Sequence, residues 1–133
     1  MANNYTEFSS FMEISSNSIK KAQMIIDKAI SEIESNDENV GCKVEIEEDG
    51  IWFGCYCGEG NPEHVEIIAR KLVEELRVNK PFFCSWAHTC SKPRVDEFGG
   101  GAFVVQRGKE TFWCDALDTV MQHVNNKVKN AKN

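Results

Sequence analysis

Residues 40–57, VGCKVEIEEDGIWFGCYC, decide the fold that we expect for this chain. Apolar and polar side chains alternate over residues 40–47, which is the pattern of a half-buried strand. Residues 51–57 form a second predicted strand, and the Asp49-Gly50 pair suits a two-residue type I′ turn between the two. This turn puts six side chains on one face, in the pairs Ile46 with Phe53, Val44 with Cys55, and Cys42 with Cys57.

A helix is expected before this hairpin. Apolar residues recur at steps close to 3.6 from Phe11 to Ile33, so the pattern predicts a helix that ends near Ser35. Ser10 and Glu13 have the spacing of a capping box at its start. The predicted helix therefore begins at Ser10. The cluster Ser15-Ser16-Asn17-Ser18 offers an alternative start, because these side chains serve better as caps than inside a helix.

A second helix follows the hairpin. Asn61 is a strong N-cap residue, and Pro62 fits the first helical position, where its missing N–H costs nothing. Asn79 and Pro81 mark the end of this helix. Its predicted apolar stripe consists of Val65, Ile68, Ala69, Leu72, Val73 and Leu76.

Three more strands and a last helix complete the prediction. Residues 82–87 form a third strand, and residues 102–107 pair with residues 110–114 around a type II′ turn at Gly108-Lys109. The last helix starts at Cys114 or Asp115. The order is α-β-β-α-β-β-β-α, so we expect residues 1–133 to form one α+β domain with flexible termini. Its sheet has five largely antiparallel strands, with the helices packed on one face.

Composition and charge exclude several classes of function. The chain has 133 residues, 41% of them hydrophobic and 27% charged, with a net charge of −6. Residues 32–50 hold eight acids against one base. Duplex nucleic acid is therefore an improbable partner, because it requires a broad basic face. No stretch reaches the roughly 20 apolar residues of a membrane span. The six cysteines predict free thiols in the cytoplasm, since no secretory signal is recognisable.

The cysteines offer two chemical alternatives. Cys42, Cys55 and Cys57 converge in the predicted hairpin, and with a fourth ligand they could hold zinc. Cys90 with His88 could act as a nucleophilic pair oriented by Asp96. However, no Cys-x-x-Cys pair is present, and the hairpin positions suit small buried side chains. We therefore expect core thiols and neither a metal nor a cofactor, with a small cysteine enzyme or zinc protein as an alternative.

The strongest candidate for a binding site is the segment 88–101, which lacks any periodicity. Long loops of this kind are often functional. Pro93 restricts the chain between two basic side chains, and three successive glycines leave backbone N–H groups open to an oxyanion. The basic side chains would contribute charge and the aromatic ones a stacking surface. The predicted ligand-binding residues are Trp86, Lys92, Arg94, Phe98, Gly99, Gly100, Gly101 and Arg107.

A second candidate surface is the sheet face opposite the helices. The predicted registers gather apolar side chains on it, and a monomer rarely exposes such a patch. We therefore expect a homodimer, or a protein partner, to cover this face. The predicted interface residues are Trp52, Tyr56, Val104 and Trp113.

Residues 91–101, SKPRVDEFGGG, resemble a segment of small uncharacterised phage and prophage proteins. The resemblance covers about a tenth of the chain. It implies a phage accessory protein that acts by binding, as an inhibitor of host defence or a trap for a signalling nucleotide. The predicted architecture is also similar to the small acidic dimeric chaperones of type III secretion, although those have three strands between their first two helices.

Together these observations favour a non-enzymatic binding protein. The expected ligand is an anionic small molecule, a nucleotide or phosphate-like group, bound by the 88–107 region and sequestered as a phage anti-defence function. The alternative is an inhibitor or chaperone that holds a host protein on the aromatic sheet face.

Overall fold

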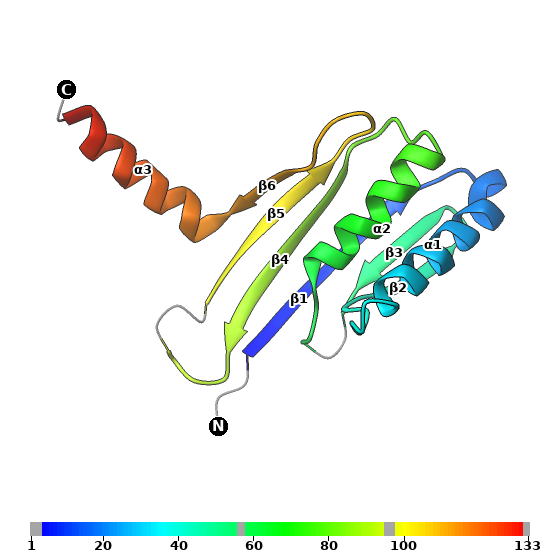
Figure 1. Ribbon diagram of the computed structural model, residues 1–133, viewed down its shortest axis with the longest axis horizontal. Coiled ribbons are helices and arrows are strands. Elements are labelled where there is room, and N and C mark those ends of the chain that lie inside the picture. Colours follow the sequence, from blue (N-terminus) through cyan, green and yellow to red (C-terminus); the bar gives the residue numbers. More distant parts are fainter. Residues whose placement is uncertain (1–3, 56–57, 95–97, 132–133) are drawn as a thin grey trace.

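The computed structural model describes residues 4–55, 58–94 and 98–131. Within these residues the chain has an α+β fold, with three α-helices and one antiparallel sheet of six strands (Figure 1). The elements in chain order are β1 (Asn4–Glu13), a 3-10 helix (Ser16–Ser18), α1 (Ile19–Glu34), β2 (Lys43–Glu47), β3 (Gly50–Gly54), α2 (Pro62–Glu75), β4 (Phe82–Cys90), β5 (Gly99–Val105), β6 (Phe112–Asp115) and α3 (Ala116–Ala131).

The sheet contains a strand, β1, whose last four residues the sequence analysis assigned to a helix. The strand order is β2-β3-β1-β4-β5-β6, so β1 lies near the middle of the sheet. Ser10 and Glu13 belong to β1 and do not cap a helix, and the first α-helix starts only at Ile19. The buried side chains of β1 are Phe8 and Met12. The assignment was wrong because Phe11 fits the spacing of the helix that follows, whereas in the structure it lies in β1 opposite Trp52.

β1 divides its pairing between two neighbours. Residues 4–8 pair antiparallel with β4, and residues 9–13 pair antiparallel with β3. At its centre, Phe8 lies opposite Trp86, and the next residue, Ser9, lies opposite Gly54. One strand therefore joins the β2–β3 hairpin to the three-stranded β4–β5–β6 unit.

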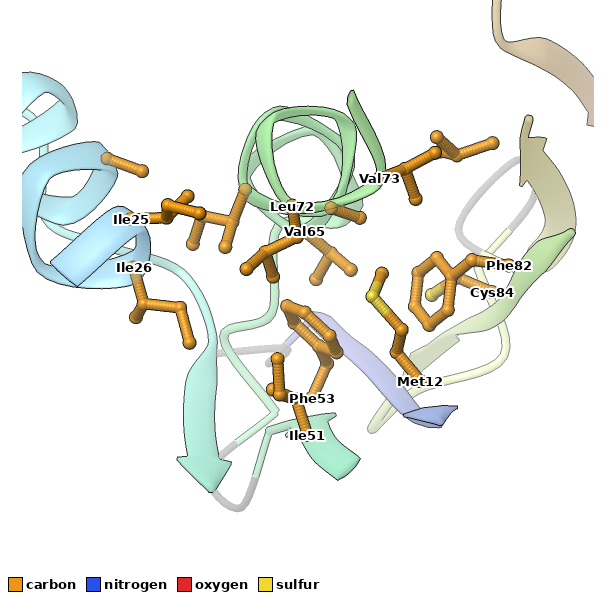
Figure 2. Close-up of a cluster of buried hydrophobic side chains, with 14 of the residues drawn as sticks. Met12, Ile25, Ile26, Ile51, Phe53, Val65, Leu72, Val73, Phe82 and Cys84 are labelled. Carbon is orange, nitrogen blue, oxygen red and sulfur yellow. The ribbon is translucent and has the colours of Figure 1, made fainter. Parts of the chain in front are cut away.

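α1 and α2 cover one face of the sheet, which we call the covered face (Figure 1). α2 begins as predicted, since the Asn61 side chain accepts a hydrogen bond of 2.9 Å from the Glu63 N–H. It ends at Glu75, earlier than predicted, and Arg77 follows with a φ of +53°. Figure 2 shows the core between these layers, with side chains of α1 and α2 packed on those of the sheet. The labelled side chains are Met12, Ile25, Ile26, Ile51, Phe53, Val65, Leu72, Val73, Phe82 and Cys84.

The first predicted hairpin exists, but its turn is shifted by one residue. Glu47 lies opposite Gly50 and Ile46 opposite Ile51, so the turn residues are Glu48 and Asp49. Each residue of β2 therefore faces a partner two positions earlier in β3 than the Asp49-Gly50 turn predicted. A shift of two leaves every side chain on its predicted face.

The second predicted hairpin has a more consequential error of register. Phe103 lies opposite Trp113, whereas the sequence analysis placed Val104 and Trp113 on one face. Val104 lies opposite Phe112, and the odd number of residues between them is incompatible with a two-residue turn. Within the turn, Gly108 has a φ of +73°, and the Lys109 N–H donates to the Gln106 carbonyl. A slip of one residue moves a side chain to the other face. Trp113 therefore lies on the covered face.

The helices do not all pack on the sheet. α3 follows β6 directly and projects away from the sheet, while α1 and α2 lie against it (Figure 1). The prediction of helices on one face is correct for α1 and α2 and wrong for α3. Among the described residues no helix combines the length and the apolar character that crossing a bilayer requires.

Candidate functional site

Three aromatic rings from the last three strands form what we call the tryptophan cluster: Trp86, Phe103 and Trp113. The ring centroids of Phe103 and Trp113 are 4.7 Å apart, and those of Trp86 and Trp113 are 5.8 Å apart. The cluster continues the core, because Phe82 contacts Phe103 at a centroid distance of 6.2 Å. Phe103 is buried, but Trp113 is 40% exposed. The cluster therefore presents ring surface to solvent.

A chain of hydrogen bonds fixes the polar edge of this cluster. The Trp86 Nε1–H lies 3.1 Å from Nε2 of His88, and Nδ1 of His88 lies 2.8 Å from Oγ1 of Thr6. Because the indole nitrogen can only donate, Nε2 of His88 is the acceptor. These contacts assign the neutral tautomer with its proton on Nδ1, which donates to Thr6. The Thr6 hydroxyl proton is left for another acceptor.

A hollow of about 290 Å³ adjoins the hydrogen-bonded chain. Thr6 and His88 line it, together with the exposed ring of Phe98 and the side chain of Asp115. Oδ1 of Asp115 accepts a hydrogen bond of 3.1 Å from the Asp118 N–H at the start of α3. The hollow thus offers a hydroxyl and a carboxylate, groups that suit the polar edge of a base or sugar better than a phosphate.

The predicted basic side chains lie on the loop next to this hollow. Lys92 and Arg94 are exposed, and the Arg94 N–H donates to the Lys92 carbonyl at 2.8 Å, which bends the chain between them. Asp96, the proposed orienting acid for Cys90, is outside the described residues. The loop continues β4 directly from His88 and Cys90. Positive charge is therefore present on the loop that joins β4 to β5, and its part in a binding site stays a prediction.

The three glycines do not form an open cradle. Gly99, Gly100 and Gly101 lie in β5, opposite His88, Ala87 and Trp86 of β4. This pairing places the glycines in a strand and not in a loop, and the ladder occupies those of their backbone groups that face β4. Close packing explains two of them instead: a Cβ at Gly101 would lie 2.7 Å from Trp86 Cζ2, and one at Gly100 would lie 2.5 Å from the Trp86 carbonyl.

Arg107 lies at the other end of the sheet. It belongs to the β5–β6 turn, whereas the loop with Lys92 and Arg94 lies at the opposite end of the same strands (Figure 1). The neighbouring Gly108 N–H donates to Glu74, and this bond, with Arg70 and Arg107 nearby, lowers the pKa of the Glu74 carboxyl. Arg107 therefore belongs to a turn anchored on α2 and does not join the predicted site.

The face opposite the helices, which we call the open face, carries only part of the predicted interface. Trp52 and Val104 lie on it, Trp113 does not, and Tyr56 is outside the described residues. The sequence analysis missed Phe83 and Phe112, which lie on either side of Val104 and are 67% and 69% exposed. Phe83 could have been found from strand alternation, because it lies in β4 between the buried residues Phe82 and Cys84 and so points to the opposite face.

Among the cysteines of the covered face, Cys84 is buried, and Cys42 and Cys55 are partly buried against the core. Burial, with smaller contributions from the neighbouring Cys55 and Cys84, raises the pKa of Cys42 to about 12. Burial also raises the pKa of Cys84. Protonated thiols are poor ligands and poor nucleophiles. Cys57, the third predicted ligand, falls outside the described residues. Within the described ranges no group of His, Cys, Asp and Glu side chains could hold a metal ion.

The proposed nucleophilic pair of His88 and Cys90 is not arranged for catalysis either. Both ring nitrogens of His88 have partners, Trp86 on one side and Thr6 on the other. A general base needs a nitrogen lone pair directed at the thiol. In this geometry the only unprotonated nitrogen of His88 accepts from the indole, so Cys90 receives no activation.

The comparisons with known proteins identify no relative of this chain. No family model matches the chain, and no curated protein or solved structure matches it. Function is therefore inferred from the side chains themselves. At the tryptophan cluster and the adjoining hollow these are ring surfaces, a hydroxyl and a carboxylate, a set that suits binding.

Proposed function

We propose that the protein binds and sequesters an anionic ligand that contains an aromatic ring, a nucleotide being the simplest example. The observation that carries this proposal is the solvent-exposed indole of Trp113 in the tryptophan cluster, next to the Trp86–His88–Thr6 hydrogen bonds. Sequestration of a nucleotide signal accords with the phage resemblance of residues 91–101.

Each part of the ligand has a matching group on the protein. The exposed face of Trp113 stacks on the base, an interaction worth about 1–3 kcal/mol. The hollow beside it takes the polar edge of the base or sugar, with Thr6 donating its hydroxyl proton and Asp115 accepting one. Lys92 and Arg94 neutralise the phosphate from the adjoining loop. His88 keeps the indole of Trp86 in place and takes no part in a reaction.

Titration of tryptophan fluorescence tests the proposal. In a Trp52→Phe background, AMP, GMP, UMP and inorganic phosphate are added separately, so the signal comes from the tryptophan cluster. We expect at least one nucleotide to change the emission and inorganic phosphate to bind more weakly. Trp113→Phe keeps the packing but reduces the stacking surface, and it should weaken binding by about tenfold or less.

A matched pair of arginine variants sharpens this test. Arg94→Ala should weaken nucleotide binding by about 10–100-fold, as expected for a charge-assisted hydrogen bond. Arg107→Ala removes the same side chain from the far end of the sheet and should leave binding unchanged. Circular dichroism confirms that both variants are folded. The absence of any response to the three nucleotides, or an equal loss in both variants, would refute the proposal.

The open face supports protein binding as a second candidate function. Phe83 and Phe112 are large, apolar and mostly exposed, which is unusual for a surface that stays in water. This face lies on the other side of the sheet from the tryptophan cluster. The two functions are therefore separable: Phe83→Ser should leave nucleotide binding intact and reduce association with any protein on the open face.

A further inference from the structure

The direction of α3 is set at its first turn. No residue separates Asp115, the last residue of β6, from Ala116, the first of α3. Asp115 accepts two hydrogen bonds from that turn, from the Asp118 N–H at 3.1 Å and from the Thr119 hydroxyl at 2.8 Å. These bonds hold the helix away from its own sheet (Figure 1).

α3 carries an apolar stripe without a surface to cover it. Leu117, Val120, Met121 and Val124 follow one another at steps of three, one and three, so they share one side of the helix. Their exposed fractions are 46%, 61%, 54% and 54%. A helix of this length is marginal in water alone and gains its stability from packing an apolar side. We therefore expect the stripe to pack on a partner surface.

The open face is such a surface. Phe83, Val104 and Phe112 stand side by side on β4, β5 and β6, because the register pairs Phe83 with Val104 and Val104 with Phe112. The next row on the same face consists of smaller side chains, Ser85, Ala102 and Cys114. Large aromatic side chains beside a row of small ones give a helix both contact area and room to approach.

We propose that α3 of one copy packs on the open face of a second copy, over Phe83, Val104 and Phe112, and that the partner returns the same contact. In the part of the chain that the structure describes, α1 and α2 leave one sheet face open, and α3 projects away from the sheet (Figure 1). A twofold axis relates such self-complementary patches and leaves neither exposed. The covered face shows that helices pack well on this sheet.

The area of these surfaces agrees with a stable dimer. Six side chains are involved in each copy, and an aromatic side chain buries 150–250 Å² when fully covered. With the exposed fractions given above, two copies would bury on the order of 1,300 Å² of apolar surface, which lies within the range of specific interfaces. The six side chains are Phe83, Phe112, Leu117, Val120, Met121 and Val124.

Oligomeric state in solution tests the proposal. Analytical ultracentrifugation of the wild-type protein should show a dimer. Met121→Lys, in the stripe, and Phe112→Glu, on the open face, should each raise the dimer dissociation constant by about 30-fold or more, as for the loss of a hot-spot side chain. Gln122→Lys introduces the same charge on the opposite side of α3 and should leave the dimer unchanged. Circular dichroism verifies the fold.

Mixing the variants distinguishes a reciprocal dimer from other associations. A heterodimer of Met121→Lys with Phe112→Glu has one unaltered contact and one in which lysine meets glutamate. An equimolar mixture should therefore form more dimer than either variant alone. A monomeric wild-type protein would overturn the proposal, even if it captured a different protein on the open face. So would a dimer that resists both substitutions, or a mixture no more dimeric than its components.

Discussion

Replacing Gly101 by alanine places a methyl group where the structure has no room. Its Cβ would lie 2.2 Å from the Cys114 carbonyl oxygen and 2.7 Å from Cζ2 of Trp86. The carbonyl belongs to the backbone of β6, and the indole is held by its hydrogen bond to His88. Either β6 or the Trp86 ring must move, so this substitution should damage both the sheet and the tryptophan cluster.

Gly99 provides a matched control in the same strand. A Cβ there meets nothing within 4 Å. Where the backbone permits it, glycine to alanine stabilises a protein by about 0.4–1 kcal/mol, because the unfolded chain loses freedom. Overpacking costs about 1–3 kcal/mol, which applies to Gly101→Ala. The free energies of unfolding of the two variants should therefore differ by about 1.5–4 kcal/mol, with Gly99→Ala the more stable.

Urea unfolding followed by circular dichroism measures this difference. Near-ultraviolet circular dichroism of the native variants reports the packing of the indoles, and we expect it to change in Gly101→Ala only. Equal stability of the two variants, with unchanged indole signals, would refute the close packing of Gly101 against Trp86 and β6.

Three further predictions concern other parts of the fold. Asn61→Ala removes the side chain that caps α2 at the Glu63 N–H and should cost about 1 kcal/mol of unfolding free energy, measured by urea unfolding. The Cys42 thiol has a pKa of about 12 in the folded protein, whereas an unfolded thiol ionises near pH 8.5. Its stabilising effect is therefore present below that pH and is lost as the pH rises toward 12, so Cys42→Ala should reduce the decline in urea midpoint over this window. The pKa of Glu74 is lowered by the Gly108 N–H and the adjacent arginines, so its effect is present above the usual carboxyl pKa and is lost on acidification. Urea midpoints of the wild type and Glu74→Gln should accordingly differ at pH 7 and converge at pH 3; a constant difference would contradict the charge interaction.

Local signals in the sequence were sufficient for some elements. Asn61 and Pro62 act on the backbone beside them, so the start of α2 was predictable without knowledge of the fold. β1 was not, because Phe11 and the Ser10–Glu13 spacing also fit a helix, and only pairing with the distant strands β3 and β4 selects a strand. Its hydrogen-bond partners are far away in the chain, where a local pattern gives no information.

Strand register limited the prediction of the site. The turn around Gly108 accommodates two loop lengths, and choosing the shorter one sent Trp113 to the wrong face. That error hid the tryptophan cluster, although Trp86 and the basic loop residues were identified. Arg107 was included because it belongs to the basic stretch 87–109, six residues after Gly101. In a strand, however, six residues span about 20 Å, so neighbours in sequence end at opposite edges of the molecule.

The central position of β1 has a consequence for how the protein folds. The two halves of the sheet are joined only when Phe8 is paired with Trp86 and Ser10 with Phe53. Pairings between residues so far apart in the chain require large loops to close, and such topologies fold slowly. During synthesis, β1 leaves the ribosome long before β4 exists. β1 is thus the first of the six described strands to be synthesised. It can pair with β4, and so join the two halves of the sheet, only after β4 has been made.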